Sequence, residues 1–310
     1  MAISIGELIC YYRKELKMTQ DELAGIYCSR KTIFNIEKGV NLPSLELIEY
    51  LSERLGVNLV NVYSNVYKHH DLETHLKFTE INDALAHEDF AELQKLVEMY
   101  GKEEGFLSGE PRQLICYVKA VLAGTRGDYA TANAEAVEGM QIAYPEYPDW
   151  TNIPDVLSNV EFAAVLSNAV NLCRMGKKKE GLEELAQMEK RLSKLLSESV
   201  YLGGDRKSAI LNFWCSCVYN QYSFADDLDK GLLKKIDNIF EYQKRSGRSH
   251  MLVELLLCKA TILMNMGKEE EAKEVYETAR ALGQVFFTSS VFNQKAKRTI
   301  GAHSDVKLFK

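Results

Sequence analysis

Residues 19–39 read TQDELAGIYCSRKTIFNIEKG, and the pattern of polar and apolar residues within this stretch is typical of two short helices. Thr19 can cap the first helix, with Glu22 three residues later completing a capping box. Ser29 can cap the second helix, and Gly39 lies where a helix-ending glycine is usual. The stretch therefore predicts a helix from Gln20 to about residue 26, a tight turn at 27–28, and a helix that runs to residue 38.

The flanking residues extend this helical pattern in both directions. Residues 43–57 read PSLELIEYLSERLGV, so Pro43 and Ser44 can open a further helix that Gly56 ends. Residues 5–16 place apolar side chains at helical spacing, which predicts an earlier amphipathic helix. The apolar residues expected to face the core of this N-terminal region are Ile5, Leu8, Ile9, Tyr12, Leu16, Leu23, Ile26, Ile33, Ile36, Leu45, Ile48, Leu51 and Leu55.

The helix predicted after Ser29 carries a polar face that suits DNA. Lys31, Phe34, Asn35 and Lys38 recur at i, i+3, i+4 and i+7 and so share one outward face, with Arg30 at its N-terminal edge. Arginine and lysine can reach guanine edges or phosphates, and asparagine can pair with adenine through two hydrogen bonds. Two short helices joined by a tight turn, with such a face on the second, form a helix-turn-helix. On this helix alone, a solvated charged surface is the more ordinary interpretation.

The whole N-terminal pattern resembles the repressor-like helix-turn-helix family over about residues 3–63. Thr19-Gln20, Glu22-Leu23-Ala24, Ser29, Thr32-Ile33, Ile36-Glu37, Gly39 and Pro43-Ser44 carry the resemblance. It implies that the glutamine that opens the first short helix contacts the DNA backbone and that the second helix reads bases. It also implies a structural ion pair between Arg13 and Glu37. The DNA-contacting residues predicted in this way are Gln20, Ser29, Arg30, Lys31, Thr32, Phe34, Asn35 and Lys38.

The seven cysteines predict neither a disulfide framework nor a zinc site. They are scattered and odd in number, and no CxxC pair occurs. Cys28 lies in the predicted turn, which is one residue shorter than the common family pattern. A redox role for Cys28 is conceivable, but packing against the core is the more ordinary function of such a thiol.

Beyond residue 67 the sequence contains a loose repeat of helical hairpins. Segments 117–136, 166–185 and 257–276 share a small residue, a glycine and then a further Ala or Gly in the order of the tetratricopeptide (TPR) signature. Weaker copies lie at 85–96 and 209–240. The turns are expected near residues 88, 127, 176, 223 and 267. This pattern predicts an all-α protein in which a helix-turn-helix domain precedes a right-handed α-solenoid of TPR-like hairpins.

A stack of such hairpins leaves a concave groove, and grooves of this kind bind extended peptides. Asparagine can both donate to and accept from a peptide backbone, so asparagines on the first helices of the hairpins are candidate peptide contacts. Each could equally be a surface residue or a link between repeats. Asn212, two residues from the aromatic Trp214, is the preferred candidate. The full set is Asn168, Asn171, Asn212 and Asn265.

Taken together, these features resemble the RRNPP family of peptide-responsive transcription regulators from Gram-positive bacteria. The resemblance implies a homodimer that binds promoter DNA through its heads and a short signalling peptide in the repeat groove. The expected domains are a helix-turn-helix domain at 1–66, a linker helix at 67–80 and a sensor and dimerisation domain at 81–310. The competing hypothesis keeps the DNA-binding head but assigns the repeats to a protein partner.

Composition and motifs argue against other classes of protein. The net charge of −6 excludes a chain coated with nucleic acid along its length, and nothing at the start resembles a secretion signal. The most apolar stretch, 209–222, is too short to cross a bilayer, so a cytoplasmic protein is expected. No nucleotide-binding loop or hydrolase motif occurs, so neither an enzyme nor a cofactor is predicted. His69, His70 and His75 lack neighbours at ligand spacing and are interpreted as solvated, with no metal.

Overall fold

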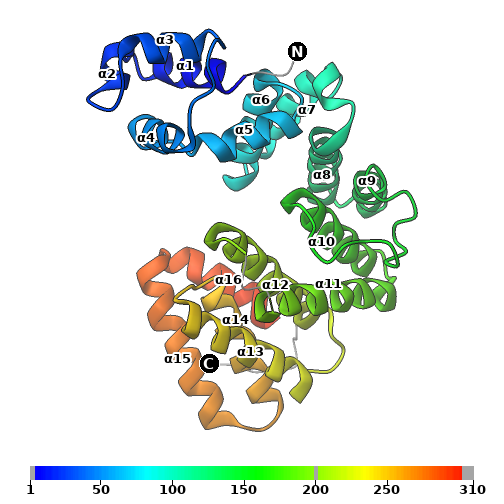
Figure 1. Ribbon diagram of the computed structural model, residues 1–310. Helices are drawn as coiled ribbons and strands as arrows, with labels where there is room; N and C mark the ends of the chain where they lie inside the picture. The colour runs from blue at the N-terminus through cyan, green and yellow to red at the C-terminus, as the bar shows by residue number, and fades with distance from the viewer. Residues whose placement is uncertain (1–3, 199–201, 302–310) are drawn as a thin grey trace. The chain divides into compact units, whose positions relative to one another are not determined.

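The computed structural model describes residues 4–198 and 202–301, and these residues form sixteen α-helices and one 3-10 helix without any strand (Figure 1). The all-α class predicted from the sequence is therefore confirmed. The helices of the N-terminal part are α1 (Ile5–Glu15), α2 (Gln20–Ala24), α3 (Arg30–Glu37), α4 (Leu45–Leu55), α5 (Leu59–Lys68), α6 (Leu72–Ala86), α7 (Phe90–Tyr100), η1 (Glu104–Phe106) and α8 (Gly109–Thr125). Those that follow are α9 (Tyr129–Gln141), α10 (Asn159–Arg174), α11 (Lys178–Glu198), α12 (Gly204–Phe224), α13 (Lys230–Ser246), α14 (Leu252–Asn265), α15 (Glu269–Phe286) and α16 (Ser289–Gly301).

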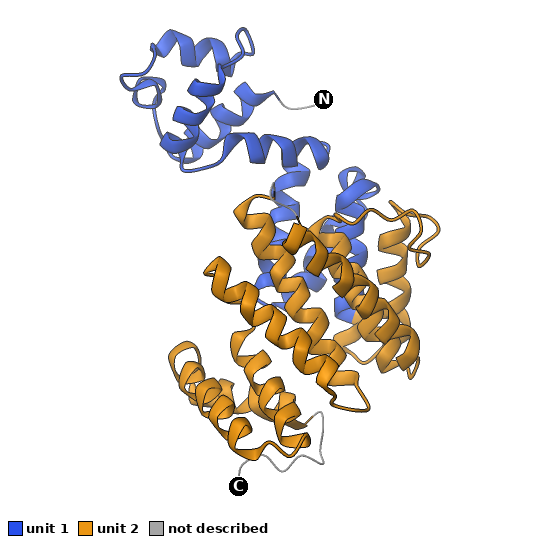
Figure 2. Cartoon of the chain, turned by 60° about the horizontal axis from the view of Figure 1, so that its bottom comes forward, with its two compact units in different colours: residues 1–122 blue, residues 123–310 orange. Residues whose placement is uncertain are grey.

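The chain divides into two compact units, residues 1–122 and 123–310, coloured separately in Figure 2. The division falls inside α8, whereas the predicted domain boundaries at 66 and 80 follow the change from head to repeats. Those boundaries stay predictions. The predicted linker helix at 67–80 is shared between α5 and α6, because the chain turns at 69–71, where His70 has φ of 74° and Asp71 caps α6.

The first five helices pack around a small core of their own. Its buried residues are Leu8, Ile9, Leu23, Ala24, Ile33, Ile36, Leu47, Leu51, Leu55, Leu59 and Val66. The predicted caps are present: the side chains of Thr19, Ser29 and Ser44 accept hydrogen bonds from the first turns of α2, α3 and α4. These caps satisfy backbone donors that a helix cannot pair internally, so each sharply fixes the start of a short helix.

Three residues predicted to face this core are exposed instead. Leu16, Ile26 and Leu45 each lie at or beyond a helix end. Helix α2 stops at Ala24 because Gly25 takes a positive φ of 51°, which turns Ile26 out into solvent. Leu45 is the first residue of α4, and the inward face of that helix begins with Leu47. For Leu16 and Ile26 the helical spacing was extended past the residues that the helix contains, and for Leu45 it was applied to the first residue of the helix, before the inward face begins.

The remaining helices form hairpins at the predicted places. The helices α6 and α7, α8 and α9, α10 and α11, α12 and α13, and α14 and α15 are connected at 87–89, 126–128, 175–177, 225–229 and 266–268, and the first, third, fourth and fifth of these pairs pack as hairpins. The fourth connection differs slightly from the prediction, because residues 223–224 are still part of α12. Gly127, Gly176 and Gly267 have φ between 74° and 85°, a conformation that side chains with a Cβ rarely adopt. This requirement explains the repeated glycine of the signature.

Within the second unit, consecutive hairpins stack on one another. Helices α10, α12 and α14 contact each other in order, and each contacts the second helix of its own hairpin. Close crossing requires small residues: a Cβ at Gly181 would lie 2.5 Å from the Ala169 carbonyl oxygen. Trp214, Tyr222 and Leu185 are among the buried residues that fill the shared core between the helices. The TPR-like arrangement predicted from the repeat is thus present in the structure.

Candidate functional site

Helix α3 presents the polar face that the sequence predicted. Ile33 and Ile36 are fully buried, which turns Lys31, Phe34 and Lys38 toward solvent. The Asn35 side chain is half-buried and, among the described residues, has no hydrogen-bond partner. The outward face of α3 is therefore open to an external ligand along its length.

Two further residues of the predicted set lie at the N-terminal end of α3. The Ser29 hydroxyl accepts from the Thr32 backbone nitrogen and lies 2.9 Å from the Thr32 hydroxyl. Arg30 is well exposed, and its nearest carboxylate, Asp21, is 3.9 Å away across solvent. An exposed pair at that distance is weak, so the guanidinium is free to exchange partners. A helix N-terminus with polar groups and a cation suits a phosphate.

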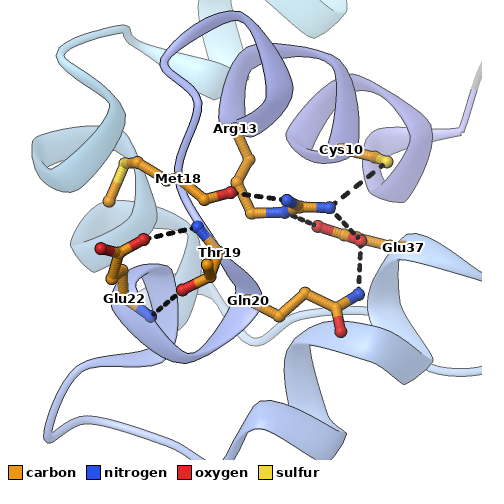
Figure 3. A network of polar contacts seen from close by, with 7 residues as sticks. All are labelled: Cys10, Arg13, Met18, Thr19, Gln20, Glu22 and Glu37. Atoms are coloured by element: carbon orange, nitrogen blue, oxygen red, sulfur yellow. Dashed lines mark hydrogen bonds and ion pairs between the residues drawn. The ribbon is translucent and has the colours of Figure 1, made fainter.

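One carboxylate, Glu37, anchors α3 to the two preceding helices (Figure 3). Arg13 Nε donates to Glu37 Oε1 at 2.5 Å, and Arg13 Nη2 donates to Oε2 at 3.0 Å. Arg13 Nη1 also donates to the Met18 carbonyl oxygen at 2.7 Å. The side chains are only 12% and 5% exposed. The predicted ion pair between Arg13 and Glu37 is present as a two-pronged contact.

The pKa values of this pair reflect the contact. The pKa of Arg13 is raised, chiefly by its hydrogen bond to Glu37. Burial alone would raise the pKa of Glu37, but hydrogen bonds from Arg13 and Gln20 outweigh it and hold that pKa below its usual range. Both groups are therefore charged at neutral pH, and the pair is a charge-assisted link between α1 and α3.

Gln20 was predicted to contact the DNA backbone, and in this structure its amide links α2 to the end of α3. Gln20 Nε2 donates to Glu37 Oε2 at 2.7 Å, as Figure 3 shows. The link from α2 to Glu37 was not anticipated from the sequence, because α2 and the end of α3 are 17 residues apart. The role of Gln20 in binding stays a prediction.

A second structural requirement of the head escaped the sequence analysis. Gly6 is buried in α1, and a Cβ there would lie 1.8 Å from the Ile36 carbonyl oxygen. Only glycine allows α1 to approach the end of α3 so closely. The signal that could have revealed this was a glycine within an otherwise regular helix, where glycine costs stability.

Cys28 packs as the ordinary interpretation suggests. It is half-buried, and it packs against the head core. Burial raises the pKa of its thiol, which keeps the thiol in its less nucleophilic protonated form. The packing explains its presence in the turn without a redox role.

The four predicted peptide contacts fall into two kinds. Asn168 is buried: its Nδ2 donates to the Tyr147 hydroxyl at 2.7 Å, and its Oδ1 accepts from Asn133 Nδ2 at 2.5 Å. Asn171 is also buried and donates to the Ser167 hydroxyl at 3.2 Å. Both amides already form hydrogen bonds within the helical domain, as the alternative interpretation of a link inside the repeats expects, and a peptide contact by either residue stays a prediction.

The other two asparagines are exposed. Asn265 ends α14 and donates weakly to the Leu228 carbonyl oxygen at 3.3 Å. Asn212 lies on α12 and, within residues 4–198 and 202–301, has no hydrogen-bond partner. Its neighbour Trp214 is buried in the repeat core as expected. Of the four asparagines, Asn212 is the most available to a ligand.

Of the three histidines predicted to be solvated, His70 is exposed, whereas His69 and His75 at the turn between α5 and α6 are not. His69 is buried, stacks on Phe78, and places its Nδ1 3.0 Å from Nδ1 of His75. Burial, with a smaller effect of His69, lowers the pKa of His75 to about 4. His75 therefore stays neutral near pH 7, and the two paired rings serve as packing at this turn. Their burial depends on Phe78, two turns into α6, which local sequence does not reveal.

The head and the hairpins together define the class of the protein: a helix-turn-helix protein with a TPR-like helical domain. Residues 11–61 match the Helix-turn-helix family (HTH_3). Over almost its whole length the chain is similar to Bacillus thuringiensis PlcR, whose crystal structure is a complex with the peptide PapR7 and DNA. The TM-score is 0.62 at 15% identity, and the match covers 96% of this chain and 99% of that chain.

At this level of identity the likeness to PlcR establishes the fold. The predicted fold, a helix-turn-helix domain followed by TPR-like helical hairpins, is therefore confirmed. No curated protein sequence matches the chain. In the described part of the chain, no helix combines the length and the apolar character that crossing a membrane requires.

Proposed function

We propose that this protein is a transcription regulator of the RRNPP type, in which the head binds double-stranded DNA. The observation that carries the proposal is the outward face of α3, which is exposed while its inward face is fixed by the core and by Glu37. A rigid helix with an open, hydrogen-bonding face is what reading a major groove requires. The helix-turn-helix match and the fold shared with PlcR support the same conclusion.

The contacts that we propose divide by chemistry. Arg30, Lys31 and Asn35 would read base edges, since these side chains can form paired hydrogen bonds to guanine or adenine. Phe34 would pack on a thymine methyl group. The polar groups at the starts of α2 and α3 and the lysine that follows α3 would hold phosphates, namely Gln20, Ser29, Thr32 and Lys38. For Gln20 this requires the amide to contact the backbone while it remains bonded to Glu37.

We further propose that the repeat domain binds a short signalling peptide and thereby controls DNA binding. The fold is that of a protein crystallised with the peptide PapR7, and Asn212 offers an exposed amide with no partner among the described residues. An extended peptide has bare backbone groups that such an amide can pair with. Asn265 would be a second contact. Asn168 and Asn171 would act by holding the hairpins that shape the groove.

The remaining assignments follow from this role. The regulator would act in the cytoplasm and would have no catalytic activity. It would be a homodimer, because two heads on adjacent half-sites multiply a weak single contact. The head would comprise residues 1–66, the connection 67–80, and the sensor and dimerisation domain 81–310. A peptide that fits one arrangement of the dimer better than another shifts the equilibrium by that difference in affinity.

Two measurements test the proposal. The full-length protein is used to select duplexes from a random DNA pool, and affinity for the recovered site is measured by fluorescence anisotropy with and without synthetic peptides encoded beside the gene. We expect a recovered consensus with two half-sites and an affinity that one peptide changes. Failure to enrich any sequence would remove the DNA-binding proposal.

The sensor is tested separately by calorimetry. Asn212→Ala should weaken peptide binding while apo DNA binding and the dimer stay unchanged. Asn152→Ala, at an exposed asparagine outside the first helices, is the matched control and should bind peptide normally. If no peptide binds but a protein partner is recovered whose binding Asn212→Ala weakens, the competing hypothesis of a protein-binding repeat domain is correct. If Asn212→Ala unfolds the protein, Asn212 is a link between repeats.

A further inference from the structure

The second unit contains a cavity of about 740 Å³ bounded by α11, α12 and α13. Its walls come from residues 193–198 near the end of α11 and residues 238–246 near the end of α13, with Lys207 and Trp214 of α12 between them. This volume lies within the range usual for small-molecule sites. Asn212 does not line the cavity, so it is distinct from the proposed peptide contact.

Trp214 gives this cavity an unusual wall. The side chain is only 6% exposed, and its indole Nε1–H has no hydrogen-bond acceptor among the residues that the structure describes. Buried tryptophan N–H groups normally have an acceptor, because the lost contact with water is otherwise uncompensated. Tyr242, also in the wall, meets the indole edge-on with ring centroids 6.3 Å apart. The cavity therefore combines two aromatic rings with an unsatisfied donor.

The charged groups of the walls leave two cations available. Lys207 and Arg245 have no ion-pair partner among the described residues, whereas Lys194 is paired with Asp155 of the loop between α9 and α10. Of the two carboxylates in the walls, Glu241 is paired with a lysine of its own helix. Glu198 has no ion-pair partner within residues 4–198 and 202–301, so the wall side chains without such a partner carry one net positive charge. Donors without acceptors thus predominate in this cavity.

We propose that this cavity is a second ligand site that binds a small organic anion. An acid group, carboxylate or phosphate, would lie between Lys207 and Arg245, since both cations can bind such an anion. A flat, unsaturated body would lie beside Tyr242 and Trp214 and offer an acceptor to the indole N–H. The inference does not depend on the proposed peptide site, because it uses other residues.

The test uses the full-length protein and four defined probes: phenyl phosphate, benzoate, inorganic phosphate and phenol. The chain has two tryptophans, so Trp150→Phe leaves Trp214 as the only indole, and its fluorescence reports on the cavity. We expect saturable binding of phenyl phosphate or benzoate, and the tighter of the two identifies the acid group. Phenol and inorganic phosphate, which lack one half of the ligand, should bind at least tenfold more weakly.

Variants then locate the binding by calorimetry. Arg245→Gln and Lys207→Gln should each weaken binding about tenfold. Lys230→Gln, an exposed lysine at the start of α13 that does not line the cavity, is the matched control and should leave it unchanged. Trp214→Phe, checked for folding by circular dichroism, keeps a ring but removes the donor and should weaken binding. Absence of saturable binding at 20 mM, or equal losses in the Lys230→Gln control, would overturn the proposal, and inorganic phosphate binding as tightly as phenyl phosphate would overturn its organic part.

Discussion

Replacing Arg13 with alanine directly weakens the contacts through which Glu37 holds α3 against α1. The change removes two charge-assisted hydrogen bonds to Glu37 and one to the Met18 carbonyl oxygen. Glu37 keeps only the donor from Gln20, while its side chain remains 5% exposed. Breaking a buried pair in this way costs about 3–5 kcal/mol, and the remaining hydrogen bond places the expected cost near the lower end, about 3 kcal/mol.

Hydrogen exchange followed by mass spectrometry measures this cost in the full-length protein. It reports the local opening of α3 even when the two compact units unfold separately, a case in which one melting temperature is not defined. A loss of about 3 kcal/mol corresponds to a roughly 100-fold faster exchange of the α3 amides in the regime where exchange follows the opening equilibrium. DNA binding should fall in parallel, because fewer molecules carry a formed head.

Two further variants make this prediction refutable. Arg30→Ala removes an exposed guanidinium whose nearest carboxylate is 3.9 Å away, so exchange in α3 should not change. Combining Arg13→Ala with Glu37→Gln removes the unpaired charge and should recover part of the lost protection. If Arg13→Ala exchanges like the wild type but no longer binds DNA, Arg13 is a DNA contact and the structural interpretation is wrong.

Three other substitutions test separate parts of the structure. Asn35→Ala should cost roughly 1–3 kcal/mol on the selected DNA site and less on random DNA in anisotropy titrations, and equal losses would make Asn35 a backbone contact. Gly6→Ala should destabilise the head, seen as faster exchange in α1 and α3, because the new Cβ would collide with a carbonyl oxygen 1.8 Å away; unchanged exchange would show that the helices can separate without cost. Burial raises the pKa of Glu184 from 4.5 to about 7. The contribution of its bound proton to the free energy of unfolding is therefore complete below pH 4.5 and is lost as the pH rises through 7. Glu184→Gln should therefore flatten the pH dependence of the free energy of unfolding, measured with urea between pH 5 and 8. At pH 8 it should stabilise the protein by up to about 3 kcal/mol. An unchanged pH dependence would mean that Glu184 titrates normally.

The features that sequence predicted well are those fixed by short-range contacts. Thr19 and Ser29 cap α2 and α3 through atoms three residues away, so the local pattern was enough. The hairpin glycines, such as Gly267, are likewise required by the backbone conformation of one residue. The face of α3 followed from helical spacing once Ile33 and Ile36 were assigned to the core. Each of these inferences needed no knowledge of the distant chain.

The features that sequence missed depend on distant partners. Asn168 is buried because the loop before α10 folds back and places the Tyr147 hydroxyl 2.7 Å from its amide. That loop is also held by Trp150, whose indole N–H donates to Glu184 on α11 at 2.8 Å. An asparagine on a repeat helix looks the same in sequence whether it faces a groove or such a loop. Ile26 was misplaced for a simpler reason, since the exact residue at which α2 ends decides which way it points.

Because Glu37 anchors α3, the residues that hold the fold of the head are different from the residues proposed to set its DNA sequence preference. The side chains that hold the helix, Arg13, Gln20 and Glu37, bond to one another and to none of the side chains proposed to read bases. A gene duplicate could therefore acquire a new target site by changing Lys31, Phe34 or Asn35 while its fold remains intact. The same separation offers a route to redirect the proposed DNA-binding head in the laboratory: exchanging those three positions for the matching residues of a helix-turn-helix repressor would transfer the operator preference of that repressor onto this scaffold.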